Sequence, residues 1–227
     1  MNRDELSRVA RDRLYPSLTN PNYLVLRARR LIFSNWLQTF KDRLDVLDIG
    51  GRYQPYRPLL KGKLSRYIAL DVQPTALVDV VGSGESIPFK DATFDLAIAT
   101  QVFEYFEKPH EAANQVHRVL RPGGALLMSV ASFAPRFVDE ECWRFTPGAL
   151  RSVLANFSIV EIRPEATSVG GVFRLANLCM HEFLKLRFLQ NVYRATLCPL
   201  VNLLGAALDK ATQDDRWTAN YSVMAIK

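Results

Sequence analysis

Glycines and an acidic residue follow two short apolar segments in the first third of the chain. The segment VLDIG at 46–50 runs into Gly50 and Gly51, and the segment YIALD at 67–71 ends in Asp71. Glycines let a backbone approach a ligand closely, and a carboxylate after a strand can accept hydrogen bonds from both hydroxyls of a ribose. Asp71 lies 21 positions after Gly50, near the spacing of about 20 for ribose-binding carboxylates. The pattern predicts a cofactor that contains a nucleoside.

Two common nucleotide-binding signatures are absent from the sequence. A dinucleotide fingerprint requires G-x-G-x-x-G, whereas GGRYQP at 50–55 has no second and third glycine in register. The phosphate loop G-x-x-x-x-G-K-[ST] does not occur either. An NAD-dependent oxidoreductase is therefore disfavoured, and an ordinary tight turn remains the alternative interpretation of the paired glycines.

Short apolar segments alternate with helical patterns along the chain. Strands are predicted at 45–50, 67–71, 77–81, 94–99, 125–130, 158–164 and 219–226. Helices are predicted at 4–14, 22–40, 109–120, 146–155 and 170–208, with RPGG at 121–124 ending the third of them. Thr146 is the predicted N-cap of the fourth, with Pro147 at its first helical position. This alternation predicts a mostly parallel, doubly wound α/β sheet that binds its ligand beyond the carboxyl ends of the strands.

Composition and charge exclude a disordered chain. The 227 residues are 48% hydrophobic, and 29 Lys and Arg against 23 Asp and Glu give a net charge of +6. This length suits one α/β domain. The densest basic group, Arg27, Arg29 and Arg30, is interpreted as a solvated helix face, so the basic excess does not indicate nucleic-acid binding.

Three cysteines without C-x-x-C spacing predict neither a disulfide framework nor a cysteine zinc site, and they fit a reducing cytoplasm. The first eight residues carry charges of both signs and do not resemble a secretory signal. The most apolar segment, 196–208, is shorter than the roughly 20 residues that span a bilayer.

Five ordered segments resemble the class I S-adenosylmethionine-dependent methyltransferases, in the small-molecule branch whose first motif is VLDIGCG. They are VLDIG at 46–50, YIALD at 67–71, IPFKDATFDL at 87–96, QVFE at 101–104 and RVLRPGG at 118–124. Two further segments, QPYRPL at 54–59 and WRFTPGAL at 143–150, are similar to methyltransferases encoded among cell-surface polysaccharide genes.

The resemblance implies a Rossmann-like sheet of seven strands whose last strand is antiparallel, with N-terminal helices and a helical insert before that strand. It also implies one methyltransferase domain over residues 1–227. Its expected parts are an N-terminal helical cap at 1–43, a cofactor-binding core at 44–165, a helical insert at 166–216 and a final strand at 217–227.

The resemblance implies S-adenosylmethionine as the cofactor and assigns residues to its parts. Gly50 and Gly51 line the methionine part, Asp48 faces the cationic end, and Asp71, followed by Val72, holds the ribose. Gly84 and Glu85 lie beside the adenine, and Thr100 and Gln101 offer a backbone carbonyl to the ammonium group. The cofactor-binding residues so implied are Asp48, Gly50, Gly51, Arg52, Asp71, Val72, Ser83, Gly84, Glu85, Thr100 and Gln101.

Two positions depart from the family pattern. Arg52 stands where a second glycine is usual, so its side chain must point away from the cofactor or contact the cofactor carboxylate. Ser83 stands where an acidic residue commonly accepts from the adenine amine. Altered affinity or a shifted loop is the expected consequence.

Catalysis requires an acceptor in line with the sulfonium and, for a hydroxyl acceptor, a general base. Tyr105 stands where the family commonly has a histidine and is a catalytic candidate for that reason, although its ordinary pKa near 10 makes it a poor base. Packing over the cofactor pocket is the alternative interpretation of Tyr105. Glu141 is the candidate base, in a loop where Trp143 and Arg144 resemble a substrate wall. No spacing suggests a metal site.

The function predicted from these residues is methyl transfer from S-adenosylmethionine to a small-molecule or glycan-like acceptor, at oxygen. Nucleic acid is not expected as the acceptor, because ATQV at 99–102 replaces the N/D-P-P-Y/F motif of nucleic-acid amino-methyltransferases. The alternative is a non-catalytic, methyltransferase-like scaffold subunit, suggested by Arg52, Ser83 and the missing histidine.

The segment 172–208 is unusually apolar, with four basic residues interspersed: Arg174, Lys185, Arg187 and Arg194. Packing over the sheet edge or homodimerisation explains such a surface. A basic amphipathic surface that touches a membrane or a lipid-linked acceptor is the sharper hypothesis. The expected location is cytoplasmic, at the membrane periphery if that hypothesis holds.

Overall fold

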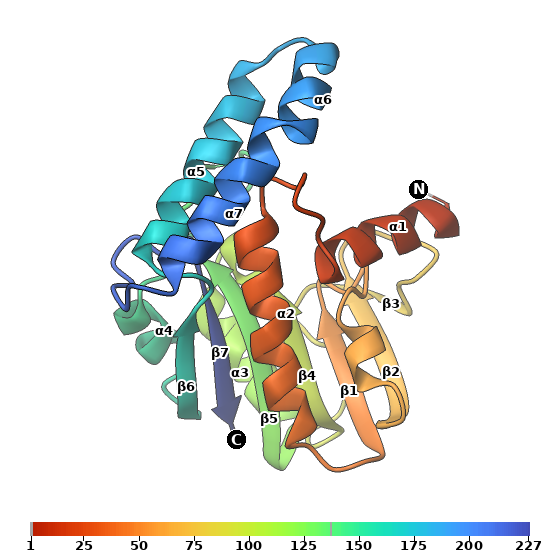
Figure 1. The fold of residues 1–227 in the computed structure, drawn as a ribbon. Helices are drawn as coiled ribbons and strands as arrows, with labels where there is room; N and C mark the ends of the chain where they lie inside the picture. The colour runs from red at the N-terminus through yellow and green to blue at the C-terminus, as the bar shows by residue number, and fades with distance from the viewer. Residues whose placement is uncertain (1, 137) are drawn as a thin grey trace.

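The computed structural model describes residues 2–136 and 138–227, whose strands form a seven-stranded sheet (Figure 1). The strand order is β3-β2-β1-β4-β5-β7-β6. The strands are β1 (Leu44–Ile49), β2 (Leu64–Asp71), β3 (Val80–Val81), β4 (Phe94–Thr100), β5 (Leu120–Ala131), β6 (Ser158–Pro164) and β7 (Asn220–Ile226). Only β7 runs against its neighbours, β5 and β6. The predicted mostly parallel sheet with an antiparallel last strand is confirmed.

The start of β5 differs from its prediction. Helix α3 (Pro109–Val119) is followed at once by strand, so RPGG at 121–124 does not form a separate turn. Phe94 pairs with Leu120 but Leu96 pairs with Ala125, so these four residues bulge out of the ladder. Gly123 has a φ of +76°, which a glycine adopts without the strain that a Cβ would bring.

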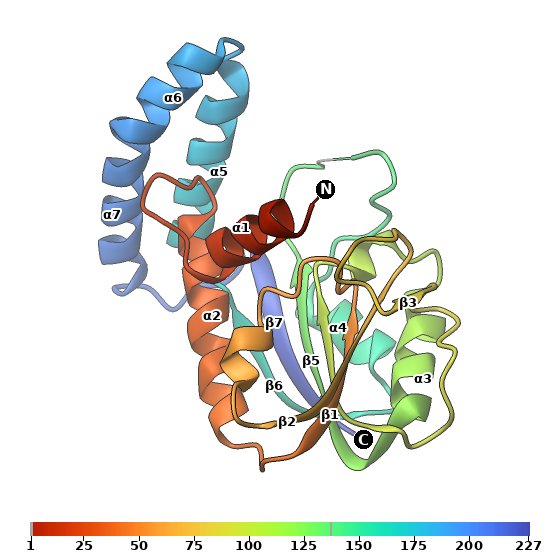
Figure 2. The same cartoon turned by 90° about the vertical axis from the view of Figure 1, so that its right-hand side faces the viewer.

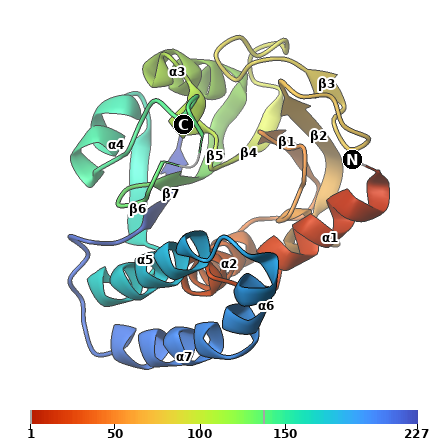
Figure 3. The same cartoon turned by 90° about the horizontal axis from the view of Figure 1, so that it is seen from above.

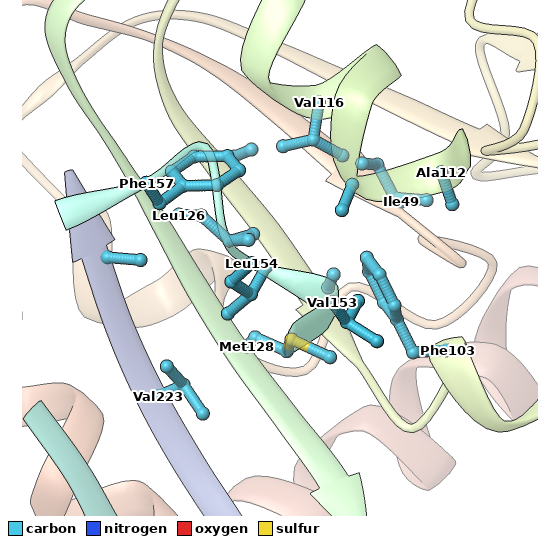
Figure 4. Close-up of a cluster of buried hydrophobic side chains, with 14 of the residues drawn as sticks. Ile49, Phe103, Ala112, Val116, Leu126, Met128, Val153, Leu154, Phe157 and Val223 are labelled. Carbon is cyan, nitrogen blue, oxygen red and sulfur yellow. The ribbon is translucent and has the colours of Figure 1, made fainter. Parts of the chain in front are cut away.

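Helices cover both faces of the sheet (Figure 3). Side chains alternate between those faces along each strand. On one face, α2 (Tyr23–Gln38) and the 3-10 helix η1 (Arg57–Leu60) cover Ala125 and Leu127 of β5. On the other, α3 and α4 (Pro147–Val153) pack on Leu126 and Met128 (Figure 4). The predicted cap of α4 is present, since Thr146 accepts a hydrogen bond from the backbone N–H of Ala149.

The insert consists of three helices: α5 (Ser168–Phe183), α6 (Arg187–Ala195) and α7 (Leu197–Asp209). Together with α1 (Arg3–Leu14), they lie at the edge where the parallel strands end (Figure 2). Asp209 Oδ1 accepts from the backbone N–H groups of Thr167, at 2.7 Å, and Gly170, at 3.0 Å. The end of α7 thus caps the start of α5 and closes the insert. Within the described residues, no helix is long and apolar enough to cross a membrane.

A buried ion pair joins α2 to the sheet. Arg29 is 5% exposed, and its Nε and Nη2 each lie 2.8 Å from a carboxylate oxygen of Glu165. Burial opposes ionisation of Glu165, but the Arg29 guanidinium and the hydroxyls of Ser129 and Ser222 outweigh it and hold its pKa below the ordinary value. The interpretation of Arg27, Arg29 and Arg30 as a solvated face is therefore wrong for Arg29, because hydrophobic spacing alone does not reveal a buried acid opposite.

We expect Glu165→Gln to lower the free energy of unfolding by about 3–5 kcal/mol, because it leaves the Arg29 guanidinium buried without a counter-charge. Urea denaturation at pH 7 measures the loss. Asp91→Asn is the matched control, since its partner Arg118 forms an exposed pair worth less than about 1 kcal/mol. The difference in free energy of unfolding between wild type and Glu165→Gln should decrease as the pH falls below 4.5, the ordinary pKa of the Glu165 carboxyl group. Protonation of Glu165 then removes the same charge that the substitution removes. A constant gap would contradict the electrostatic cause.

Candidate functional site

The loop after β1 forms a backbone cradle at the carboxyl edge of the sheet. Gly50 has a φ of +75°, and the N–H groups of Gly50 and Gly51 both donate to the Leu70 carbonyl, at 2.8 and 3.1 Å. A Cβ on Gly51 would lie 2.7 Å from the Asp48 carbonyl oxygen and 3.0 Å from Cβ of Ala69. This crowding requires glycine at position 51 and keeps the loop close to the ends of β1 and β2.

Asp71 ends β2 beside this loop and is 8% exposed. Its Oδ2 accepts from the backbone N–H of Arg52 at 3.3 Å, and its Oδ1 accepts from the backbone N–H of Gln73 at 2.9 Å. Each oxygen of an ionised carboxylate can accept more than one hydrogen bond, so both remain able to receive a hydroxyl donor. The geometry fits the expected ribose contact. Val72, the next residue, is largely exposed.

Asp48 lies in a different environment from Asp71, although both are buried. Its Oδ2 accepts from the Tyr67 hydroxyl at 2.5 Å, and its Cγ is 3.0 Å from where a Cβ on Gly51 would lie. Burial raises the pKa of Asp48 to about 7; the Tyr67 hydrogen bond opposes that rise and the charge of Asp71 adds to it. Asp48 therefore packs against the glycine loop at Gly51. Its expected contact with the cationic end of the cofactor stays a prediction.

The side chains of Arg52 and Ser83, which depart from the family pattern, both contact other residues of the chain. The Arg52 guanidinium contacts Gln73 Oε1 and lies 5.1 Å from the centre of the Tyr53 ring. Ser83 Oγ accepts from the backbone N–H of Glu85 at 3.1 Å. Both side chains thus have partners within the chain, which shows how the sequence accommodates them.

Residues 83–85 and 100–101 lie at the same carboxyl edge. A Cβ on Gly84 would come within 2.5 Å of Phe106 Cζ, and Glu85 Oε1 accepts from the backbone N–H of Lys108 at 2.8 Å. Gln101, directly after Thr100 at the end of β4, has a φ of +52°, a conformation uncommon for a residue other than glycine. Strained backbone of this kind often marks a functional position.

A cavity of about 190 Å³ lies next to Gln101. Tyr105, Glu141 and Arg144 line it, so the structure brings both predicted catalytic residues and one predicted substrate residue together. The Tyr105 hydroxyl lies 3.4 Å from Glu141 Oε1, and Glu141 Oε2 accepts from Arg144 Nη2. Burial and the charge of Glu141 raise the pKa of Tyr105, which makes it a still poorer base. Trp143 is not among the lining residues; its Nε1 donates to the Phe106 carbonyl at 2.7 Å.

Three further polar residues line this cavity without having been predicted: Glu104, Arg174 and Asn220. Glu104 is 2% exposed, and its carbonyl accepts from the backbone N–H groups of Cys142, at 2.7 Å, and Trp143, at 3.1 Å. Burial raises its pKa to about 7, while its own backbone and that of Ala131 oppose the rise. The signal in the sequence was an acidic residue inside the apolar run 102–106. Nothing in the sequence linked the other two to this place.

Residues 47–128 match a protein family described as "Methyltransferase domain". A malonyl-[acyl-carrier protein] O-methyltransferase of Methylococcus capsulatus is 35% identical over 69 residues, which are 30% of this chain and 25% of that protein. The chain aligns with half or less of the length of the curated relatives it matches.

Solved structures share the fold over most of the chain. An S-adenosylmethionine-dependent methyltransferase from Mesorhizobium loti has a TM-score of 0.55 at 16% identity, with 88% of this chain and 98% of that chain covered. A Burkholderia thailandensis 1,6-didemethyltoxoflavin-N1-methyltransferase with bound S-adenosylhomocysteine has a TM-score of 0.55 at 15% identity, with 90% and 78% covered. The chain therefore shares the fold of these solved methyltransferases, and its residues 47–128 match the methyltransferase-domain family.

We expect Gly51→Ala to weaken S-adenosylmethionine binding by about tenfold or more, because the added Cβ displaces the loop from the Asp48 carbonyl. Isothermal titration calorimetry measures the affinity. Gly148→Ala is the control, since a Cβ there meets only Thr146 Oγ1 at 3.8 Å. Equal affinities of the two variants would show that the close approach of the loop does not matter for the cofactor.

Proposed function

We propose that this protein transfers a methyl group from S-adenosylmethionine to an oxygen atom of a small-molecule or glycan-like acceptor. The observation that carries the proposal is the continuity of the carboxyl edge. Asp71 after β2, the glycine cradle after β1 and the strained Gln101 after β4 follow one another along it, and a polar cavity opens beside Gln101. A cofactor site and an acceptor site thus adjoin, as in-line transfer requires.

The proposed roles follow the positions of the residues along this edge. Gly50 and Gly51 approach the methionine part, and Asp71 accepts from the ribose hydroxyls. The segment 83–85 borders the adenine, and the backbone at 100–101 faces the ammonium group. The cofactor supplies an electrophilic methyl group on a positively charged sulfur. The chain supplies the orientation of the cofactor and the acceptor.

Oxygen is proposed as the acceptor atom because the cavity contains carboxylates. A hydroxyl must lose its proton as it is methylated, and a carboxylate beside it can receive that proton. Glu141 is one such group, held by Arg144. The resemblance of residues 143–150 to methyltransferases encoded among polysaccharide genes supports a glycan-like acceptor, as does the position of Arg144, from that segment, in the cavity wall.

The alternative of a non-catalytic scaffold loses part of its motivation. It rested on Arg52, Ser83 and the missing histidine. The Arg52 guanidinium contacts Gln73, while its backbone N–H supports Asp71. Ser83 stabilises the turn that leads to Glu85. Both departures are thus accommodated around an intact loop.

Calorimetric titration with S-adenosylmethionine, S-adenosylhomocysteine and NAD tests the proposal. We expect the two sulfur compounds to bind and NAD not to bind. Asp71→Ala should weaken binding by about tenfold or more, because it removes charge-assisted hydrogen bonds. Asp91→Ala is the control, since its side chain is 76% exposed. Absence of binding by folded wild-type protein would favour the scaffold, and binding of NAD alone would favour an oxidoreductase.

The insert is proposed to contact a membrane or a lipid-linked acceptor, which would place a cytoplasmic protein at the membrane periphery. Phe183, Leu186 and Phe188, where α5 passes into α6, are 78%, 66% and 74% exposed. Lys185 and Arg187 alternate with them and are also exposed. Bulky apolar side chains among basic ones suit an interface with anionic lipid. A homodimer is the competing explanation of the same surface.

We expect the protein to sediment with phosphatidylcholine vesicles that contain phosphatidylglycerol and less with pure phosphatidylcholine, because anionic lipid attracts Lys185 and Arg187. Phe183→Asp should reduce sedimentation several-fold. Val160→Asp, an equivalent change at an exposed position of β6, should not. No sedimentation with either vesicle would refute membrane contact, and a dimer in analytical ultracentrifugation that Phe183→Asp dissociates would assign the surface to a second copy.

A further inference from the structure

Two buried oxygen atoms beside the cavity have no hydrogen-bond partner among the described residues. They are Oε2 of Glu104 and Oδ1 of Asn220, in side chains that belong to residues 2% and 1% exposed. Buried acceptors in folded proteins are normally paired, and leaving one unpaired costs free energy. The other Glu104 oxygen accepts from the backbone N–H of Ala131, which fixes the carboxyl group in place. A ligand with hydroxyl donors would satisfy the two unpaired acceptors.

Arg174, from the first turns of α5, is a buried cation in the same cavity wall. It is 5% exposed, and its Nε donates to Asn22 Oδ1 at 2.8 Å. In the described part of the chain, no carboxylate lies within 4 Å of its guanidinium nitrogens. Burial and the charges of Arg29 and Arg144 lower its pKa to about 10, while the charge of Glu165 opposes that fall, so Arg174 remains a cation at neutral pH.

Comparison with two other arginines shows that they have an ion-pair partner, whereas Arg174 has none among the described residues. Arg29 is equally buried, but Glu165 neutralises it through two hydrogen bonds of 2.8 Å. Arg144 lines the same cavity and pairs with Glu141. A buried cation without a counter-ion is costly and is normally compensated. The missing compensation points to an anionic ligand.

The cavity is large enough for such a ligand. Its volume of about 190 Å³ is several times the roughly 30 Å³ that one water molecule occupies in the liquid. The wall includes Arg174, which has no carboxylate within 4 Å among the described residues, and two residues that each bury one oxygen atom without a partner, Glu104 and Asn220. An anionic group and a hydroxyl group in one molecule would match this set.

We propose that this cavity binds the methyl acceptor, and that the acceptor carries both an anionic group, held by Arg174, and a hydroxyl group, whose proton Glu104 accepts. The proposal rests on the methyl-transfer function above and narrows its substrate class to acidic hydroxyl compounds, such as acidic sugars. The anion is a carboxylate or a phosphate, since the Arg174 guanidinium matches both.

The proton and electron balance of the step is simple. The acceptor hydroxyl gives its proton to Oε2 of ionised Glu104 as its oxygen bonds to the methyl carbon. The carbon–sulfur bond breaks, and its electron pair stays on sulfur as a neutral thioether. A carboxyl group with a pKa of about 7 is suited to act as a base near neutral pH. Glu141 is committed to Arg144, which leaves Glu104 with the oxygen that has no partner.

Matched sugars test the anion requirement by calorimetry, with and without S-adenosylhomocysteine. The probes are D-glucuronate, D-glucose 6-phosphate and D-glucose, which differ at one carbon. We expect at least one anionic sugar to bind about tenfold or more tighter than glucose, because only an anion compensates Arg174. Arg174→Met should abolish that preference. Which anionic sugar binds tighter tells carboxylate from phosphate.

Three further variants keep the test decisive. Arg151→Met removes the same charge from an exposed position of α4 that does not line the cavity, and should retain the preference. Arg174→Gln retains a donor for Asn22 and replaces Arg174→Met should that variant fail to fold. Glu104→Gln should remove the pH dependence of anion binding between pH 6 and 8, because burial raises the pKa of Glu104 to about 7 and the carboxyl group becomes negative in that range; Tyr105, Glu141, Arg144 and Arg174 are the other titratable groups that line the cavity.

The outcomes separate this proposal from the function on which it rests. Equal binding of all three sugars, no binding of any of them, or an anion preference that survives in Arg174→Met overturns it. So does unchanged pH dependence in Glu104→Gln. S-adenosylmethionine should bind wild type and Arg174→Met alike. If that cofactor does not bind while anionic sugars do, methyl transfer fails and the anion site stands.

Discussion

The buried pair between Arg29 and Glu165 is the interaction on which the arrangement of the carboxyl edge depends. Glu165 follows β6 and accepts from Arg29 of α2, from Ser129 of β5, and from Asn220 and Ser222 of β7. Four separate segments therefore meet at one carboxylate with no exposed surface. Because an ionised group in the interior must be fully hydrogen-bonded, these segments cannot shift independently.

This pair also determines where the insert begins. Glu165 lies three residues before α5, and Asp209 at the end of α7 caps the start of that helix. Arg174 is thereby held in the wall of the cavity, which Glu104 of the 3-10 helix η2 (Phe103–Tyr105) also lines. Asn220 belongs both to the Glu165 network and to the cavity wall. Its Nδ2 donates to Glu165, while its Oδ1 has no partner among the described residues. The structural network thus extends directly into the proposed acceptor site.

Buried charges in this protein fall into two kinds. Glu165 and Arg29 compensate each other, so burial costs them little and their ionised forms are favoured. In the part of the chain that the structure describes, Asp48, Glu104 and Arg174 have no ion-pair partner of opposite charge, and burial shifts the pKa of each in the direction that favours its neutral form. The first kind is typical of a structural role. The second kind is typical of positions that contact a ligand, because a bound ligand can supply the opposite charge or the hydrogen bond that the protein does not provide.

The cofactor half of the edge follows from local sequence. The loop at 50–51, Asp71, the segment 83–85 and Gln101 each directly follow or adjoin a strand of a parallel sheet, so the strand pattern alone places them at the same edge. The sequence also determined the sheet class and the Thr146 cap. The sequence did not determine which acidic and basic side chains from distant segments lie next to each other in the fold. Arg29 and Glu165 are 136 positions apart, and Glu104 and Arg174 come from elements with no shared periodicity. Only tertiary packing decided that Arg29 pairs with Glu165 and that Glu104 and Arg174 line one cavity, because the surroundings of a buried charge depend on every element around it and on no single segment.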